Sequence, residues 1–149
     1  MATHYLPPGQ VFASKMPTRV TTIVGSSVAV CLWDGDLHVG GINHYLLPHL
    51  PSGAAPSGRF GDSAFAILLD ALIELGCKPQ LLKARVIGGA CTIQAFLGRR
   101  DHLGRQNTEV AIKQLRDNSI PSVEWVTSGE SGRKLVFCTS DGSAVIESI

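Results

Sequence analysis

Residues 20–48 read VTTIVGSSVAVCLWDGDLHVGGINHYLLP, and they contain two apolar runs that are each interrupted by polar residues. The first interruption is Gly25-Ser26-Ser27. The second is His44, which lies between a pair of glycines and a Leu-Leu-Pro sequence. If the two runs form adjacent strands, the hydroxyl of the first interruption and the imidazole of the second meet across them. A nucleophile and its general base require that geometry.

The same stretch predicts strands joined by a tight turn. Residues 21–24 are rich in β-branched side chains, which favour strands. Residues 28–33 are apolar throughout, which is typical of a strand buried on both faces, although a short buried helix would give the same run. Asp34-Gly35-Asp36 favours a hairpin turn, so residues 37–47 are predicted to form the returning strand.

A long loop and a clear helix follow this stretch. Residues 48–61 are rich in Pro, Ser and Gly, and a loop of that length is often functional. The helix is predicted to begin with Asp62 or Ser63 as its cap, because apolar residues then recur at the helical period. It is predicted to end near Gly76.

A second helix is predicted over residues 109–116, with Asn107 or Thr108 as its cap. The segment before it, residues 96–105, is polar and basic. We expect this segment to be a solvated loop. The alternative is a loop that contacts a partner and extends to Asn107.

The remaining segments predict strands and a single domain, residues 1–149. Residues 5–12 are expected to form an initial strand or an ordered arm, and residues 81–87 a strand that ends at Gly88-Gly89-Ala90. Two or three further strands are predicted to form an antiparallel meander, over residues 123–127, 134–139 and 144–149. The order of helices and strands predicts an α+β fold with antiparallel or mixed sheets.

The composition is that of a folded protein with little net charge. Of the 149 residues, 44% are hydrophobic, and the net charge is +1 at pH 7. Acidic and basic residues are mixed along the chain, so no nucleic-acid partner is expected. No apolar run approaches the length of a membrane span, and the N-terminal segment lacks the apolar core of a signal peptide. We therefore expect a cytoplasmic protein that does not insert into a membrane.

The cysteines predict buried thiols rather than a metal site. They are Cys31, Cys77, Cys91 and Cys138, and they show neither Cys-x-x-Cys spacing nor histidines at zinc-finger spacing. Most have apolar neighbours, so we expect them to pack as small hydrophobic side chains, with disulfides as the alternative. No metal and no other cofactor is predicted.

Separated motifs occur in a fixed order along the chain: Thr21, Gly25-Ser26-Ser27-Val28, Gly41-Ile42-x-His44-x-x-Leu47-Pro48, Ile87-Gly88-Gly89-Ala90 and Gly104-Arg105-Gln106-Asn107. Together they resemble the chemoreceptor glutamine deamidases of the CheD family, over nearly the whole chain. A set of separated motifs is far more specific than any one of them. The resemblance implies a papain-like, permuted Cys-hydrolase fold, a layered α/β sandwich of mixed or antiparallel sheets with two main helices.

The resemblance also implies catalytic roles. In that family the residue after Gly-Ser is the nucleophilic cysteine, and Ser27 occupies its position here. His44 corresponds to the general base and Thr21 to the third catalytic residue. The implied reaction converts receptor glutamine side chains to glutamate and releases ammonia, with the chemoreceptor as substrate and a CheC-type phosphatase as partner. The backbone N–H groups of Gly25-Ser26-Ser27-Val28 are the expected oxyanion donors, because glycine lets a substrate approach closely.

Serine at position 27 weakens the expected chemistry. A serine hydroxyl is not ionised near pH 7, and serine hydrolases compensate with a buried carboxylate behind the histidine. Thr21, expected to hold the imidazole of His44, carries no charge, and Thr22 is expected to point to the opposite face of the strand. Loss of an activated nucleophile costs about 10⁴- to 10⁶-fold in rate. We therefore expect a folded chain that is nearly inactive, since serine and cysteine are almost isosteric.

Three interpretations of the function remain open at the level of the sequence. The first is a glutamine deamidase in which the nucleophile was replaced by serine, deliberately or in a natural homologue; the otherwise retained pattern favours a deliberate change. The second is a non-catalytic chemotaxis adaptor that binds the receptor or the phosphatase. The third is a true serine hydrolase with Ser27 and His44, which needs Asp34 or Asp36 behind the imidazole.

Overall fold

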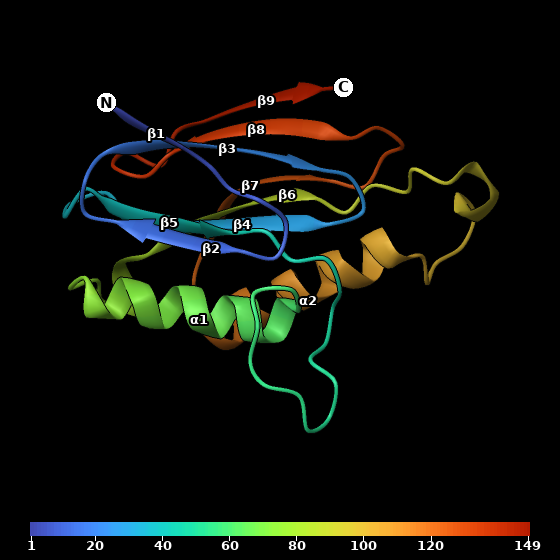
Figure 1. Cartoon of the computed structure of the whole chain (residues 1–149), viewed down its shortest axis with the longest axis horizontal. Helices are drawn as coiled ribbons and strands as arrows, with labels where there is room; N and C mark the ends of the chain where they lie inside the picture. The colour runs from blue at the N-terminus through green and yellow to red at the C-terminus, as the bar shows by residue number, and fades with distance from the viewer.

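Two stacked β-sheets, with two helices over the outer face of one sheet, make up the computed structural model, which describes residues 1–149 (Figure 1). The strands are β1 (Ala2–Tyr5), β2 (Val11–Ser14), β3 (Thr18–Val24), β4 (Val28–Asp34), β5 (Val39–Asn43), β6 (Lys83–Gly88), β7 (Ser122–Thr127), β8 (Arg133–Cys138) and β9 (Ala144–Ser148). The helices are α1 (Gly61–Glu74) and α2 (Leu103–Asp117), with short 3₁₀ turns at Pro79–Leu81 and Gln94–Phe96.

The sheets have the strand orders β1-β3-β8-β9 and β2-β5-β4-β6-β7. Each contains a single parallel pair, β1 with β3 in the first and β6 with β7 in the second, among antiparallel pairs. The predicted α+β class is therefore confirmed, as are the layered sandwich, the mixed sheets and the two main helices. The predicted hairpin turn after residue 33 is also confirmed, because it joins the antiparallel strands β4 and β5.

Strand β4 is apolar throughout because it contributes side chains to a core on each face of its sheet. Val28 and Leu32 lie in the core between this sheet and the helices. Ala29 and Cys31 lie in the core between the two sheets. Neighbouring residues of a strand point to opposite faces, so both halves of the apolar run are buried. The predicted strand is confirmed, and the alternative of a short helix is excluded.

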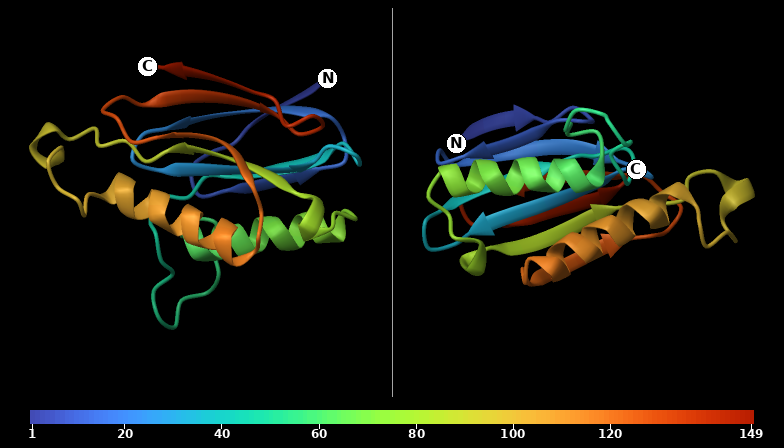
Figure 2. Two further views of the ribbon diagram at one scale, coloured as in Figure 1. Left: turned by 180° about the vertical axis from the view of Figure 1, so that it is seen from behind. Right: turned by 90° about the horizontal axis from the view of Figure 1, so that it is seen from below.

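Helices α1 and α2 lie side by side on the five-stranded sheet, as the view from below in Figure 2 shows. Helix α1 begins at Gly61, and its N-cap position is Phe60, which makes no side-chain cap. The predicted caps Asp62 and Ser63 are therefore wrong, since both lie in the first turn. The carboxylate of Asp62 instead accepts a hydrogen bond from the backbone N–H of Leu50. This bond connects the loop before the helix to the first helical turn. The loop at residues 47–60 projects beyond the helices (Figures 1 and 2).

The start of helix α2 differs from its prediction. The helix begins at Leu103 rather than at residue 109, and the ring Nδ1 of His102 accepts from the backbone N–H of Arg105 at 3.2 Å. The predicted caps, Asn107 and Thr108, thus lie inside the helix. The first two turns are mostly polar and include a glycine, so they carry a weak helical pattern. Contacts with the glycine segment after β6, described below, hold them in place.

The predicted meander of the last three strands is wrong. Strand β7 pairs in parallel with β6 in the five-stranded sheet, because helix α2 forms the crossover between them. Strands β8 and β9 form an antiparallel hairpin in the other sheet, where β8 pairs with β3. The chain changes sheets at Ser128 and Gly129, which both have positive φ, 65° and 78°.

The N-terminal residues form two strands in different sheets rather than one. Strand β1 pairs with β3, and β2 pairs with β5. Pro7 and Pro8 lie between them, and the buried Leu6 precedes this break. The returning strand β5 is also shorter than predicted, because it ends before His44. A single bridge between Val28 and Tyr45 continues the pairing with β4.

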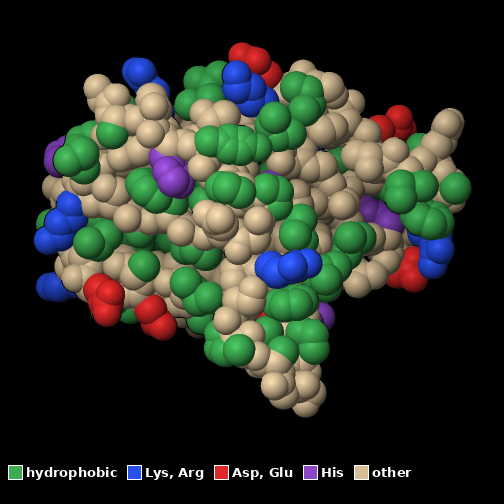
Figure 3. Space-filling view, in the orientation of Figure 1, with side chains coloured by type: hydrophobic (Ala, Val, Ile, Leu, Met, Phe, Trp, Pro, Cys, Tyr) green, Lys and Arg blue, Asp and Glu red, His purple; other side chains and the backbone are tan.

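The surface carries mixed charge. Basic and acidic side chains are interspersed over the face drawn in Figure 3 rather than gathered in one stripe. A segment between β6 and α2 extends from one end of the molecule (Figures 1 and 2). Neither helix combines the length and the apolar character that crossing a membrane requires.

Candidate active site

Ser27 lies in the turn between β3 and β4, and only 8% of its surface is exposed. The glycine segment after β6 fastens this turn: Gly89 N–H donates to the Ser27 carbonyl at 3.0 Å, and Ala90 N–H donates to the Gly25 carbonyl at 2.9 Å. Gly88 has φ +122°, and a Cβ there would lie 2.2 Å from the Ser27 carbonyl oxygen. Only glycine permits this backbone conformation at such close approach.

His44 follows β5 and is held by the N-terminal segment that joins β1 to β2. Its backbone N–H donates to the Gln10 carbonyl at 3.2 Å, and its carbonyl accepts from Gly9 N–H at 2.7 Å. The side chain is almost fully buried, with 1% of the residue exposed. The irregular start of the chain, predicted as an initial strand or an ordered arm, therefore positions the predicted base.

The structure brings Ser27 and His44 together as predicted. Ser27 Oγ lies 2.8 Å from His44 Nε2, which is hydrogen-bonding distance. On the other side of the ring, Thr22 Oγ1 lies 2.7 Å from His44 Nδ1 and donates to the Leu6 carbonyl at 2.8 Å. These contacts form a buried chain that runs from residue 27 through the imidazole to the backbone of the N-terminal segment.

The same contacts define the tautomer of His44. The Thr22 hydroxyl has one hydrogen, and the Leu6 carbonyl can only accept, so that hydrogen is used there. Thr22 must then accept from His44 Nδ1–H. Nδ1 carries the ring proton, and the unprotonated Nε2 faces Ser27 Oγ. This is the tautomer in which the ring takes a proton from residue 27.

The prediction that Thr21 holds the imidazole is therefore corrected, because the residue that contacts the ring is Thr22. Side chains alternate along β3, and the fully buried Thr22 shares its face with Val20 and Val24. Thr21 lies on the opposite face with the exposed Arg19. The alternation was available in the sequence, since an arginine marks the solvent side and two valines mark the core side.

Burial makes the imidazole a neutral base. Desolvation lowers the pKa of His44 from 6.5 to about 4, so the ring is uncharged at pH 7. No carboxylate lies behind it, since that place belongs to Thr22 and the Leu6 carbonyl. Asp34 is engaged at the far end of β4, where its Oδ1 accepts from the N–H groups of Asp36 and Leu37. The arrangement needed by the serine-hydrolase interpretation is therefore absent.

The turn offers fewer oxyanion donors than predicted. The backbone N–H of Val28 donates to the Tyr45 carbonyl at 3.1 Å, so it cannot also donate to an oxyanion. The prediction of Val28 as an oxyanion donor is therefore wrong. The N–H groups of Gly25, Ser26 and Ser27 donate to no protein acceptor. These three backbone groups stay available for charge that develops on a substrate oxygen.

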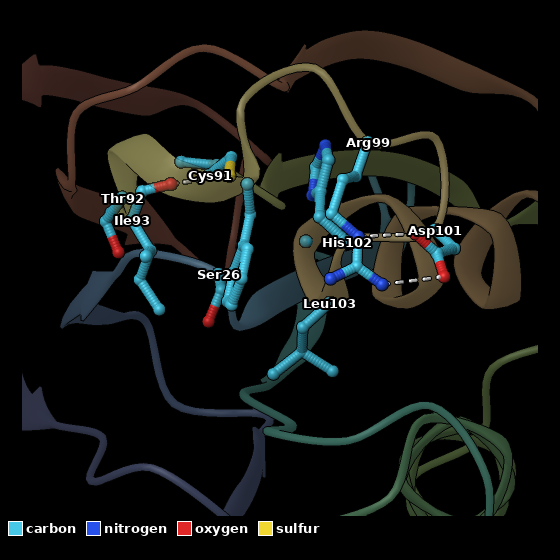
Figure 4. Close-up of a pocket in the computed structure, with 11 residues that line it drawn as sticks. Ser26, Cys91, Thr92, Ile93, Arg99, Asp101, His102 and Leu103 are labelled. Carbon is cyan, nitrogen blue, oxygen red and sulfur yellow. Dashed lines mark hydrogen bonds and ion pairs between the residues drawn. The ribbon is translucent and has the colours of Figure 1, made fainter.

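A cavity of about 310 Å³ adjoins the turn at Ser26. Figure 4 shows Ser26 between Ile93 on one side and Leu103 on the other, with the ion pair of Arg99 and Asp101 at the rim. Leu103 lies within residues 96–105, which the sequence assigned to a solvated loop, and Ile93 lies shortly before that segment. The cavity gives the turn an open side next to the predicted nucleophile position.

The four cysteines are unpaired and buried, as predicted. Cys31 lies in the core between the sheets, where burial raises the pKa of its thiol far above the ordinary value. A thiol held in its neutral form is a poor nucleophile, so Cys31 does not substitute for Ser27. The structure places no group of three or more His, Cys, Asp or Glu side chains where they could hold a metal ion.

The fold and the site define a class of protein: a layered α+β sandwich with a hydrolase-type pair of nucleophile position and neutral imidazole. The family model described as CheD chemotactic sensory transduction matches residues 46–148. This chain therefore belongs to the CheD family.

Relatives extend the match across the site residues. The chain is 41% identical to a probable chemoreceptor glutamine deamidase CheD 1 of Anaeromyxobacter dehalogenans, over 97% of this chain and 84% of the relative. It is 37% identical to a probable chemoreceptor glutamine deamidase CheD of Rhodospirillum rubrum, over 100% of this chain and 84% of the relative. A third relative, from Rhizobium rhizogenes, is 40% identical over 84% of this chain and 67% of its own length.

Proposed function

We propose that this chain has the architecture of a protein-glutamine deamidase for chemoreceptors, and that serine at position 27 leaves it nearly inactive. The observation that carries the proposal is the buried chain of contacts from Ser27 through His44 to Thr22, beside an open cavity. The relatives are named as deamidases of chemoreceptor glutamines, and the amide of glutamine is the bond that such a pair would hydrolyse.

The reaction proceeds in two steps when residue 27 carries a thiol. The thiolate attacks the side-chain carbonyl carbon of the glutamine, and the backbone N–H groups of the turn stabilise the oxyanion. The imidazolium of His44 then donates its proton to the departing nitrogen, so ammonia leaves and a thioester remains. Water, deprotonated by the imidazole, hydrolyses the thioester to glutamate and restores the thiol.

Serine interrupts this sequence at the attack. A thiol exchanges its proton with a nearby imidazole near neutral pH, whereas a hydroxyl keeps its proton until the transition state. The positive charge that would then form on His44 meets only the hydroxyl of Thr22 and a carbonyl, and no carboxylate. We expect the rate to be about 10⁴- to 10⁶-fold below that of a cysteine form.

The decisive experiment is Ser27→Cys with ammonia release measured on a folded chemoreceptor cytoplasmic fragment. We expect release from Ser27→Cys and at most a trace from the parent, and we expect His44→Ala added to Ser27→Cys to abolish it. The matched control is Ser26→Cys, which places a thiol in the same turn at the residue before position 27, where no hydrogen bond to the imidazole is formed. A folded Ser27→Cys protein that releases no ammonia would contradict the proposed reaction.

The second candidate function is a non-catalytic adaptor in chemotaxis, favoured by the serine itself. Such a protein would bind the chemoreceptor, or a CheC-type phosphatase, without converting glutamine. The two candidates separate in the same assay: the adaptor binds the receptor fragment yet releases no ammonia after Ser27→Cys.

A further inference from the structure

The sequence motif at residues 104–107 has no role in the chemistry described so far, yet its last residue touches both halves of the site. Asn107 lies in helix α2 and is fully buried. Its side-chain Nδ2 donates to the Ser26 carbonyl and to the Leu46 carbonyl, each at 3.0 Å. Both partners are acceptors, so the amide must present its NH₂ group to them.

These two carbonyls belong to the two segments whose separation determines the catalytic contact. Ser26 directly precedes residue 27, and Leu46 lies two residues after His44. On the strand side, backbone hydrogen bonds between Val28 and Tyr45 already join the segments in both directions. The Asn107 amide joins them from the helix side, so the nucleophile position and the imidazole are held between two bridges.

Gly104 and Gly89 bring helix α2 close enough for this contact, since a Cβ at Gly89 would lie 2.1 Å from Thr108 Oγ1 in the helix. A Cβ at Gly104 would lie 2.4 Å from the carbonyl oxygens of Gly89 and Ala90. The Tyr45 hydroxyl donates to the Asn107 carbonyl at 2.5 Å, which anchors the same turn of the helix to the segment after His44.

The Oδ1 atom of Asn107 is buried and has no hydrogen-bond partner. The side chain therefore makes its hydrogen bonds within the protein through Nδ2, and both go to carbonyls outside helix α2. The Asn107 amide thus supplies two hydrogen bonds, one to the segment of residue 27 and one to the segment of His44.

We propose that Asn107 is a positioning residue that sets the distance between residue 27 and His44 by bridging the Ser26 and Leu46 carbonyls. A test that measures kcat on the receptor rests on the proposed function, whereas the bridge made by Asn107 does not depend on it. A thiol at position 27 reports the same geometry chemically, because its sulfur reacts as the thiolate and the neighbouring imidazole must accept the proton.

The test uses Ser27→Cys protein and compares Asn107→Ala and Asn107→Asp with it. Iodoacetamide alkylation at position 27, followed by mass spectrometry of that peptide near pH 7, should slow about tenfold in both variants. On the receptor fragment, kcat should fall about 10²-fold while KM changes less than about threefold, since a displacement near 1 Å has such an effect on rate.

The matched control is Asn118→Ala, which removes an asparagine just after the same helix. Asn118 Nδ2 donates to the Gln114 carbonyl at 2.8 Å, away from the site. This variant should keep the alkylation rate and kcat of the Ser27→Cys parent.

Folding is checked by thermal unfolding, and Asn107→Asp, nearly isosteric, decides the matter if Asn107→Ala does not fold. Unchanged alkylation in a folded Asn107 variant would overturn the proposal. Slowed alkylation would support it even if the Ser27→Cys parent released no ammonia, and in that case the proposed function alone would fail.

Discussion

The hydroxyl of Thr22 keeps the ring proton of His44 on Nδ1, so that the unprotonated Nε2 faces residue 27. In Ser27→Cys protein, we expect Thr22→Val to lower kcat about 10- to 10²-fold, because the ring loses the acceptor that holds the Nδ1–H tautomer. Thr22→Ser should retain most of the activity. The ¹⁵N chemical shifts of the two ring nitrogens report the tautomer directly.

The control for this prediction is Thr21→Val, the same substitution one residue earlier on the opposite face of β3. It should leave both kcat and the ring spectrum unchanged. The reverse result, with Thr21→Val harmful and Thr22→Val harmless, would contradict the contact seen here.

Some contacts of single residues in the site were predictable from the sequence, and others were not. The pairing of position 27 with His44 was predicted because the motifs around both residues resemble those of the CheD family, since a lone histidine in an apolar strand is more often a buried core residue. The contacts of Leu6, Gly9 and Gln10 were not, since they use backbone atoms and leave no trace in side-chain identity. Asn107 was visible in a motif, but its position near a helix start suggested a cap.

At the scale of elements, the end of β6 supports the catalytic turn through backbone contacts alone. Gly88→Ala should destabilise the protein by about 2–4 kcal/mol, because the new Cβ collides with the Ser27 carbonyl at a positive φ. Urea unfolding measures the stability, and alkylation of Ser27→Cys protein should show a displaced turn. Gly98→Ala is the control, since nothing lies within 4 Å of its Cβ position and its effect should stay within about 0.5 kcal/mol.

The elements that the sequence predicted well are those whose signal is local. The α1 helix follows from its apolar period, and β4 follows from an apolar run that two cores require. The pairing of β7 with β6 depends on a crossover through α2, and the sequence could not distinguish it from a hairpin partner. The start of α2 was missed because tertiary contacts of Gly104 stabilise turns with weak helical preference.

At the scale of the whole molecule, folding buries His44 in its neutral form, and this couples global stability to pH. The folded pKa of about 4 lies below the ordinary value of 6.5, so the unfolded chain binds a proton first as pH falls. The contribution of neutral His44 to the free energy of unfolding is fully present above pH 6.5. It is lost as the pH falls toward 4, and the total loss is about 3 kcal/mol. Urea unfolding of the parent and of His44→Gln across this range should therefore differ in pH dependence, with the flatter profile in His44→Gln. His38→Gln, at an exposed histidine, is the matched control, and parallel profiles for the parent and His44→Gln would show that the imidazole is not held neutral by burial.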